Sequence, residues 1–222
     1  MDFGKAFTYP FQDPDWVKKI LIPALVLLIP ILGQIIVLGW ALEITRRVIR
    51  QDPQPLPELD FGKNLSDGFK GFVIGLVYAI PAIILSIPPI IVSALTESGN
   101  SNSDSLGPVV VIVMLCCYGL LFIYGLALNI VLPAALSHFV ATENLGAAFR
   151  FSEVFGLVRA APGAYLMVLL GIILAGIIGG LGSIICFIGV LATYAYAFAI
   201  EGHLYGQAYN EATANRGYAR AY

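Results

Sequence analysis

The sequence predicts an all-α integral membrane protein, a helical bundle of about six membrane segments arranged as three hairpins with short interfacial helices. Of its 222 residues, 59% are hydrophobic and only 12% are charged, whereas a soluble domain normally carries about a quarter charged residues. The mean hydropathy is +0.86. The apolar runs are continuous rather than alternating, which excludes a transmembrane β-barrel. A helical bundle is the other architecture that pairs every backbone N–H and C=O group within lipid.

The net charge and the positions of the cysteines indicate which kinds of binding partner to expect. The net charge is -2 and the chain has no basic tract, so no nucleic acid is expected as a partner. All three cysteines, Cys116, Cys117 and Cys186, lie within apolar runs and lack CxxC spacing. We expect them to be small buried hydrophobic side chains rather than redox or metal-binding groups. The lipid bilayer is therefore the first expected partner.

The whole chain, residues 1–222, is expected to form a single transmembrane domain, and its first hairpin covers about residues 15–50. Asp13 and Pro14 suit the start of a helix, with Asp as N-cap and Pro at the first helical position. An uncharged run at residues 20–42 is interrupted near its midpoint by the turn-like sequence Pro-Ile-Leu-Gly at residues 30–33. Two interpretations are open: one membrane-spanning helix, or a hairpin that turns at this tetrapeptide.

The distribution of positive charge favours the hairpin. With a hairpin, all 12 Lys and Arg residues lie on one side of the membrane, and the positive-inside rule makes that side cytoplasmic. A single span would instead place Lys5, Lys18 and Lys19 outside. Each arm of this hairpin is short, about 11 apolar residues or roughly 16 Å. It therefore needs snorkelling Lys and Arg side chains, or a re-entrant geometry shielded by protein. Both termini are then cytoplasmic.

Two longer hairpins follow, at about residues 70–138 and 164–205. The second hairpin has apolar runs at residues 71–95 and 108–137, separated by a polar loop at residues 96–107. Pro81, Pro88 and Pro89 are expected to kink or shorten its first helix. The third hairpin is an uncharged stretch at residues 164–200, which is too long for one span, and its turn is expected at residues 179–183.

Polar segments that contain Phe precede the three hairpins, at residues 2–9, 60–70 and 143–160, and are expected to be interfacial helices. The first two begin with the same tetrapeptide, Asp-Phe-Gly-Lys, at residues 2–5 and 60–63. Because all three segments occupy the same place relative to a hairpin, we interpret the pattern as an internal repeat.

Few polar side chains are candidates for a functional site inside the membrane. No Asp, Glu, Lys, Arg or His lies within an apolar run, and ion-coupled transporters usually hold such groups near the midplane. Asn129 is the strongest intramembrane polar candidate. An interhelical hydrogen bond is expected of it, rather than a contact with a ligand.

Four ionisable residues stand where the hairpins end: Glu43, His138, Glu201 and His203. Two imidazoles and two carboxylates would suit a divalent metal, but no HExxH-type spacing supports such a site. Separate polar helix ends are the favoured interpretation, so we expect no metal, no cofactor and no catalytic residue.

Glu43, Arg46 and Arg47 have i,i+3 and i,i+4 spacing, which predicts an ordinary ion pair on a helix surface. A lipid-headgroup site made by Arg46, Arg47, Arg50 and Lys70 is a less favoured alternative, because acidic residues dilute the basic cluster. Small residues at helical spacing predict close helix packing at Gly71, Gly75, Gly171, Ala175, Gly176, Gly179 and Gly180.

Short motifs along nearly the whole chain resemble the domain of unknown function numbered 4013, a family of prokaryotic polytopic membrane proteins. The family's usual Gly-Tyr is Gly39-Trp40 in this chain. The resemblance implies a prokaryotic cytoplasmic membrane protein and brings no known activity, substrate or catalytic residue. The other motifs that carry it are Asp15-Trp16, Lys-Ile-Leu-Ile at 19–22, Ile29-Pro30, Arg46, Leu-Pro-Glu at 56–58, Leu-Gly-Ala-Ala-Phe-Arg-Phe-Ser at 145–152 and His-Leu-Tyr-Gly-Gln at 203–207.

These observations favour a non-catalytic accessory or scaffold subunit of a membrane protein assembly, with a membrane protein partner or self-association. The glycine-rich helices and the charge-free interior support this hypothesis. The alternative is a small transporter or channel for an apolar or lipid-like substrate, since internal repeats and broken helices are usual in transporters. An enzyme acting at the cytoplasmic interface through the four ionisable residues at the hairpin ends ranks third.

Overall fold

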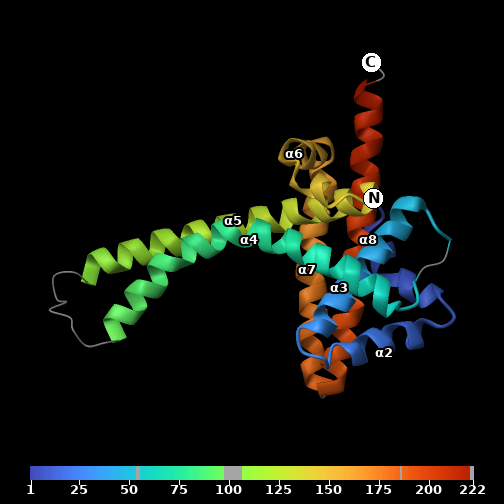
Figure 1. Ribbon diagram of the computed structural model, residues 1–222, viewed down its shortest axis with the longest axis horizontal. Helices are drawn as coiled ribbons and strands as arrows, with labels where there is room; N and C mark the ends of the chain where they lie inside the picture. The colour runs from blue at the N-terminus through green and yellow to red at the C-terminus, as the bar shows by residue number, and fades with distance from the viewer. Residues whose placement is uncertain (54–55, 98–106, 186, 221–222) are drawn as a thin grey trace. The chain divides into compact units, whose positions relative to one another are not determined.

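The computed structural model describes residues 1–53, 56–97, 107–185 and 187–220, and every regular element in these ranges is a helix (Figure 1). This confirms the predicted all-α class. Cys186 and residues 98–106 of the predicted polar loop lie outside the described residues. In chain order the elements are α1 (Phe3–Thr8), η1 (Tyr9–Gln12), α2 (Trp16–Val26), α3 (Leu32–Arg50), α4 (Phe61–Glu97), α5 (Gly107–Thr142), η2 (Leu145–Phe149), α6 (Phe151–Ala160), α7 (Pro162–Leu181), η3 (Gly182–Ile185) and α8 (Phe187–Arg220).

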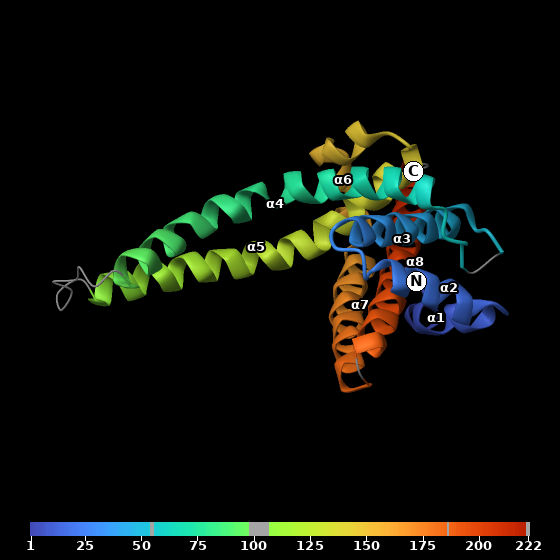
Figure 2. The same ribbon diagram turned by 60° about the horizontal axis from the view of Figure 1, so that its bottom comes forward.

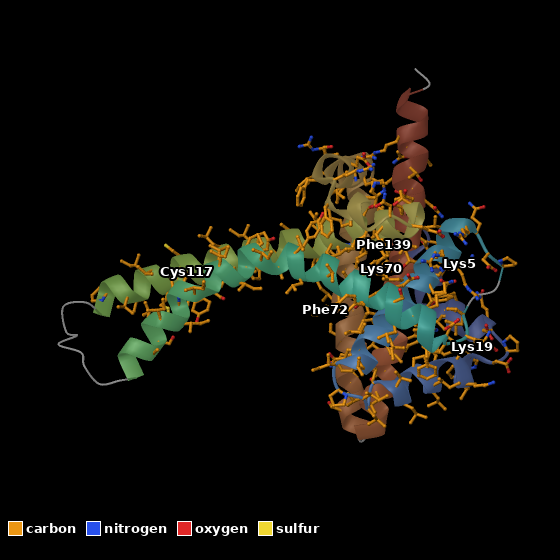
Figure 3. The ribbon with its side chains drawn as sticks, in the orientation of Figure 1. Lys5, Lys19, Lys70, Phe72, Cys117 and Phe139 are labelled. Atoms are coloured by element: carbon orange, nitrogen blue, oxygen red, sulfur yellow. The ribbon has the colours of Figure 1, made fainter. Side chains whose placement is uncertain are left out.

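The chain divides into two compact units: residues 1–74 with 130–222, and residues 75–129. In the smaller unit, α4 and α5 run side by side in both views (Figures 1 and 2). The Tyr124 hydroxyl joins them by donating to the Tyr78 carbonyl at 2.6 Å. Most of their large apolar side chains are exposed, as expected for helices whose outer surface contacts lipid. Cys116 is exposed and Cys117 is partly exposed, so the prediction that they are buried is wrong. Cys117 lies on α5 in this unit (Figure 3).

Helix α8 is the central element of the larger unit and packs against α7, α3, α2, α6 and α1. Its contact with α3 is close, because a Cβ atom added to Gly202 would lie 2.4 Å from the Ala41 carbonyl oxygen. The core beside this contact is formed by fully buried Trp40 and Ile44, with Tyr9 from η1. The Trp40 indole donates to the Pro57 carbonyl at 3.1 Å, so its polar edge is satisfied within the core.

Helices α3 and α4 cross where two glycines meet. A Cβ atom on Gly39 would lie 1.8 Å from the Asn64 carbonyl oxygen, and one on Gly68 would lie 1.8 Å from the Ile35 carbonyl oxygen. The two backbones therefore approach to a distance that no larger residue permits. This crossing brings the charged end of α3 alongside the first turns of α4.

Three helices are long and apolar enough to cross a membrane, at residues 61–94 of α4, 110–142 of α5 and 162–181 of α7. Six membrane segments were predicted, so within the described residues the prediction holds only in part. Helix α2 has 11 residues, and the second half of α3 carries Glu43, Arg46, Arg47 and Arg50. Neither matches the length and composition of a full span, for which about 20 apolar residues are needed.

The first apolar run does form two helices, as the charge distribution suggested. Helix α2 ends at Val26 and α3 begins at Leu32, with Ile31 at a φ of 65° in the turn between them. The start of α2 and the end of α3, which form the open end of this pair, lie close together. Lys19 of α2 and Arg47 of α3 both donate to the Leu56 carbonyl, at 3.1 and 3.4 Å. The run is therefore a short helical hairpin rather than a single helix.

Several boundaries differ from those predicted. Residues 60–70 are not a separate interfacial helix but form the start of α4, and residues 143–160 form two helices, η2 and α6, rather than one. Helix α4 continues past its three prolines to Glu97. The last turn is at η3 (Gly182–Ile185), later than the predicted residues 179–183, because α7 continues to Leu181.

The shared Asp-Phe-Gly-Lys sequence forms the same local structure twice. Asp2 accepts a hydrogen bond from the Lys5 backbone N–H at 3.0 Å, and Asp60 accepts one from the Lys63 backbone N–H at 3.0 Å. Both carboxylates are thus N-caps of a helix. In the third polar segment, residues 143–160, Arg150 is the N-cap of α6 but its side chain makes no capping hydrogen bond. Helix capping by itself accounts for the tetrapeptide, and the internal repeat stays a prediction.

Candidate functional site

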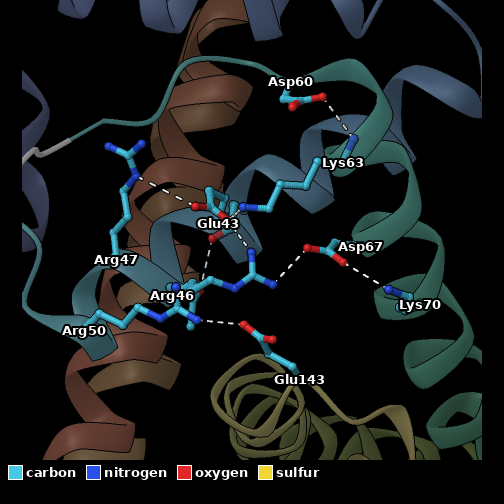
Figure 4. A network of polar contacts seen from close by, with 11 residues as sticks. Glu43, Arg46, Arg47, Arg50, Asp60, Lys63, Asp67, Lys70 and Glu143 are labelled. Carbon is cyan, nitrogen blue, oxygen red and sulfur yellow. Dashed lines mark hydrogen bonds and ion pairs between the residues drawn. The ribbon is translucent and has the colours of Figure 1, made fainter.

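An ion-pair network lies at the crossing of α3 and α4 (Figure 4). Its centre is Arg46, which is buried and pairs with Glu43 on its own helix and with Asp67 of α4, the latter at 2.9 Å. Burial opposes the charged form of Arg46, but the hydrogen bonds to Asp67 and Glu43 outweigh it and raise the guanidinium pKa. The arginine is therefore charged at every physiological pH and joins the two helices.

Three more cations surround this centre. Lys63 pairs with Glu43 at 2.9 Å, and Lys70 pairs with Asp67 at 3.3 Å. Arg50 pairs with Glu143, which follows α5, at 2.7 Å (Figure 4). The sequence indicated ion pairs of Glu43 with Arg46 and with Arg47, and both are present. It did not indicate Asp67, Lys63 or Glu143, although the i,i+4 and i,i+3 spacing of Lys63, Asp67 and Lys70 on one helix was a readable signal.

Arg46 and Arg47 share Glu43 but line different clefts. Arg47 lies 3.9 Å from Glu43 and donates to the Leu56 carbonyl. Lys19 of α2 donates to the same carbonyl, so Arg47 lies on the side of α3 that faces α2. The lipid-headgroup alternative, which grouped Arg47 with Arg46, Arg50 and Lys70, therefore combined residues from two surfaces.

His203 lies in a separate cleft of about 450 Å³, which α1, η1, α3 and α8 line together with residues 51–53. Its ring stacks on Tyr9 with ring centroids 4.2 Å apart. The Gln207 amide donates to His203 Nδ1 at 2.9 Å, an arrangement that requires the neutral form at that nitrogen. Burial, followed by repulsion from Lys5, lowers the pKa of His203 to about 4, against the attraction of Asp2.

His138 makes a different set of contacts. Its Nε2 lies 2.8 Å from a carboxylate oxygen of Glu153 in α6, and the Tyr209 hydroxyl of α8 lies 3.5 Å from its Nδ1. The hydrogen bond from His138 lowers the pKa of Glu153. Arg216 of α8 donates to the Glu153 carbonyl at 2.7 Å. These contacts attach α6 to the ends of α5 and α8.

The four ionisable residues at the hairpin ends are therefore not brought together. Glu201 contacts the Tyr205 hydroxyl at 3.4 Å, and burial raises its pKa to about 7. Glu43, His138 and His203 each have the separate partners given above. Among the residues that the structure describes, no group of three or more His, Cys, Asp or Glu side chains could hold a metal ion.

Asn129 donates at 2.8 Å to the Gly125 carbonyl of its own helix. The hydrogen bond that Asn129 makes is therefore within α5, whereas a bond between helices was expected.

The predicted packing residues separate into two groups. Gly71 packs against Leu42, Gly171 against Leu204, and Gly179 against Tyr194, while Ala175 is fully buried. In contrast, a Cβ atom added to Gly75, Gly176 or Gly180 would meet nothing within 4 Å. One face of α7 thus packs on α8, and the other face carries two open glycines one helical turn apart.

Comparison with protein families identifies this chain's family. The family model described as a protein of unknown function (DUF4013) matches residues 22–188. Comparisons with curated proteins and with solved structures yield no match. The matched region covers the end of α2, the whole of α3 with its crossing with α4, and α5, α6 and α7. The chain belongs to this family of proteins of unknown function, DUF4013.

Proposed function

We propose that this protein is a non-catalytic multi-pass membrane protein that acts as an accessory or scaffold subunit of a membrane protein assembly. The observation that carries the proposal is the outward face of α7, where Gly176 and Gly180 are exposed. Exposed Ile173, Ile177 and Leu181 flank them on the same helix. Small residues one turn apart let a second helix approach closely, and larger neighbours provide its packing contacts.

The internal packing of α7 strengthens this inference. Its opposite face is already occupied by α8, at Gly171, Ala175 and Gly179. The open glycines are therefore not needed for the fold of the chain itself. The partner is a transmembrane helix, from another membrane protein or from a second copy.

The proposed topology has six membrane segments with both termini in the cytoplasm of a prokaryotic cell. Helices α4, α5, α7 and the uncharged part of α8 cross the bilayer. The short α2–α3 hairpin enters it from the cytoplasmic side and is shielded by α8, against which both of its helices pack. Lys19, Arg46 and Arg47 at its open end lie at headgroup level.

Cysteine labelling tests this topology. In a background without the native cysteines, Lys5→Cys is expected to react with a membrane-impermeant maleimide only after the cells are permeabilised. Ser183→Cys, at the turn of the last hairpin, is the control and is expected to react in intact cells. Labelling of Lys5→Cys from outside would mean that the first apolar run places the N-terminus outside.

A pull-down of the tagged protein in mild detergent, read by mass spectrometry, tests the accessory role. We expect a stoichiometric membrane protein partner, or a defined oligomer of this chain, with the wild type. With the Gly176→Leu/Gly180→Leu double variant, the amount of recovered partner should fall at least tenfold, because the added side chains hold the partner helix away.

Gly163→Leu is the matched control, since Gly163 lies on the same helix and a Cβ atom there also meets nothing within 4 Å. It should retain the partner. A wild-type protein that purifies as a lone monomer would overturn the proposal and favour the alternative, a small transporter or channel for an apolar or lipid-like substrate.

A further inference from the structure

A second cleft, of about 340 Å³, opens beside the ion-pair network and is independent of the partner surface on α7. Its volume is at the lower end of the range of about 300–1,000 Å³ that is usual for small-molecule sites. We infer that this cleft binds a phosphate group, carried by an anionic lipid headgroup or by a soluble phosphate ester. It is lined by Arg46, Arg50, Lys63, Ser66, Asp67, Lys70, Phe139 and Glu143.

The lining has an excess of positive charge. Four cations come from α3 and α4, and two carboxylates, Asp67 and Glu143, line the cleft with them. Glu43 also pairs with Arg46 and Lys63, which leaves one net positive charge. A ligand with one negative charge would balance the cleft. Arg and Lys side chains that converge in this way form the usual site for phosphate, to which a guanidinium donates two hydrogen bonds at once.

The four cations differ in their freedom to bind a ligand. The Arg46 side chain is only 8% exposed and is held by Glu43 and Asp67, so its role is structural. In contrast, the side chains of Arg50, Lys63 and Lys70 are 63%, 49% and 43% exposed. An ion pair that is exposed on both sides, such as Arg50–Glu143, contributes little to stability because water screens it. When Lys63 and Lys70 turn away, the mostly buried carboxylates of Glu43 and Asp67 keep their pairing with Arg46. The three outer cations can therefore turn to a phosphate without loss of the fold.

The position of the cleft suits a lipid phosphate. Lys70 immediately precedes the apolar run that begins at Gly71, and Phe139 lines the cleft from the last turns of α5 (Figure 3). Exposed Phe69 and Phe72 flank Lys70 on α4. Basic side chains at the polar end of an apolar helix, with aromatic neighbours, are at the level where lipid phosphates lie.

The test measures lipid binding by the full-length protein. The protein is reconstituted in nanodiscs of phosphatidylcholine with or without phosphatidylglycerol, and the lipids that remain bound are quantified by native mass spectrometry. We expect retention of phosphatidylglycerol over phosphatidylcholine. The Arg50→Gln/Lys63→Gln/Lys70→Gln variant should bind it on the order of a hundredfold more weakly, because three surface cations are removed.

Lys5→Gln/Lys18→Gln/Arg159→Gln is the matched control, since it changes the net charge equally at exposed positions outside the cleft. It should bind as the wild type does. A second variant, Ser66→Glu, breaks no ion pair and places a carboxylate at the cleft wall, and it should weaken binding by about tenfold. This variant keeps the test decisive if the triple variant fails to fold.

A parallel titration with glycerol 3-phosphate, in detergent free of lipid, separates the two sources of phosphate. Binding of this compound with the same dependence on the three cations, without any preference among nanodisc lipids, would support the site and assign it to a soluble phosphate ester. Equal retention of both lipids together with no binding of glycerol 3-phosphate would overturn the inference. An equal loss in the cleft variant and the control would also overturn it. The partner test on α7 has a different readout, so the failure of one proposal leaves the other standing.

Discussion

Replacing Gly39 with alanine is expected to destabilise the protein by about 3 kcal/mol or more, the upper end of the range for overpacking. The new methyl carbon would lie 1.8 Å from the Asn64 carbonyl oxygen, an atom of the backbone that cannot rotate away. Helices α3 and α4 would have to separate, and the pairing of Arg46 with Asp67 would weaken with them. Thermal unfolding in a nonionic detergent should show a midpoint lower by roughly 6–12 °C.

Gly75→Ala on α4 is the matched control, because a Cβ atom there meets nothing within 4 Å. Alanine is a better helix former than glycine, so this variant should be neutral or more stable by up to about 1 kcal/mol. Gly68→Ala should resemble Gly39→Ala, and the double variant should lose less than the sum, since both changes open the same contact. Equal melting of Gly39→Ala and Gly75→Ala would contradict the glycine crossing.

A second large effect is expected at His203 as the pH falls. The ordinary pKa of 6.5 is lowered to about 4 in the folded protein, so the folded state favours the neutral ring. The stabilisation from this preference is complete above about pH 6.5 and is lost as the pH falls towards 4, where the folded state must also bind the proton. The difference between the two pKa values corresponds to about 3 kcal/mol.

Other groups must be separated from this effect. Lys5, Asp2, Arg47 and Asp52 line the same cleft. Glu201 acts in the opposite direction, because its pKa is raised to about 7 and its contribution to stability is lost as the pH rises. The pH dependence of the wild type alone is therefore a poor measure of His203.

Comparing the wild type with the His203→Asn variant isolates the contribution of His203 to the pH dependence of stability. At pH 7 the wild type should be the more stable protein, and this advantage should shrink by about 3 kcal/mol between pH 7 and pH 4. His138→Asn is the control for the loss of a histidine, since the chain has two. It loses the hydrogen bond that lowers the pKa of Glu153, but it should keep the contribution of about 3 kcal/mol that His203 makes between pH 7 and pH 4. A constant difference between the wild type and His203→Asn across this range would show that His203 does not carry the effect.

Much of the architecture could be predicted from the sequence because it depends on local composition. The continuous apolar runs determined the helical class, and Pro30 with its neighbours marked a true turn between α2 and α3. The N-cap residues Asp2 and Asp60 marked two helix starts. Turns and caps are set by the residues that form them, so a short window of sequence contains the necessary information.

The predictions that failed depended on continuity and length. Residues 60–70 look polar enough for a separate helix, yet they extend α4, because nothing between Ser66 and Gly71 breaks the helix. The prediction of six membrane segments is confirmed only in part: three described helices have the length and composition of a span, and charged residues leave only part of α3 apolar. Polarity alone does not end a helix, and an apolar run alone does not ensure a span.

The sequence by itself determined that this chain is helical, that it has helices apolar enough for a membrane, and that its charged residues collect near the helix ends. Only the tertiary structure decided that Gly171 and Gly179 pack internally while Gly176 and Gly180 face outward. It also decided that Arg46 pairs with Asp67, whereas Arg47 turns away to Leu56. The reason is physical: composition acts along the chain, but the partner of a side chain depends on how helices distant in sequence cross, and here α3 and α4 cross where two glycines let their backbones meet.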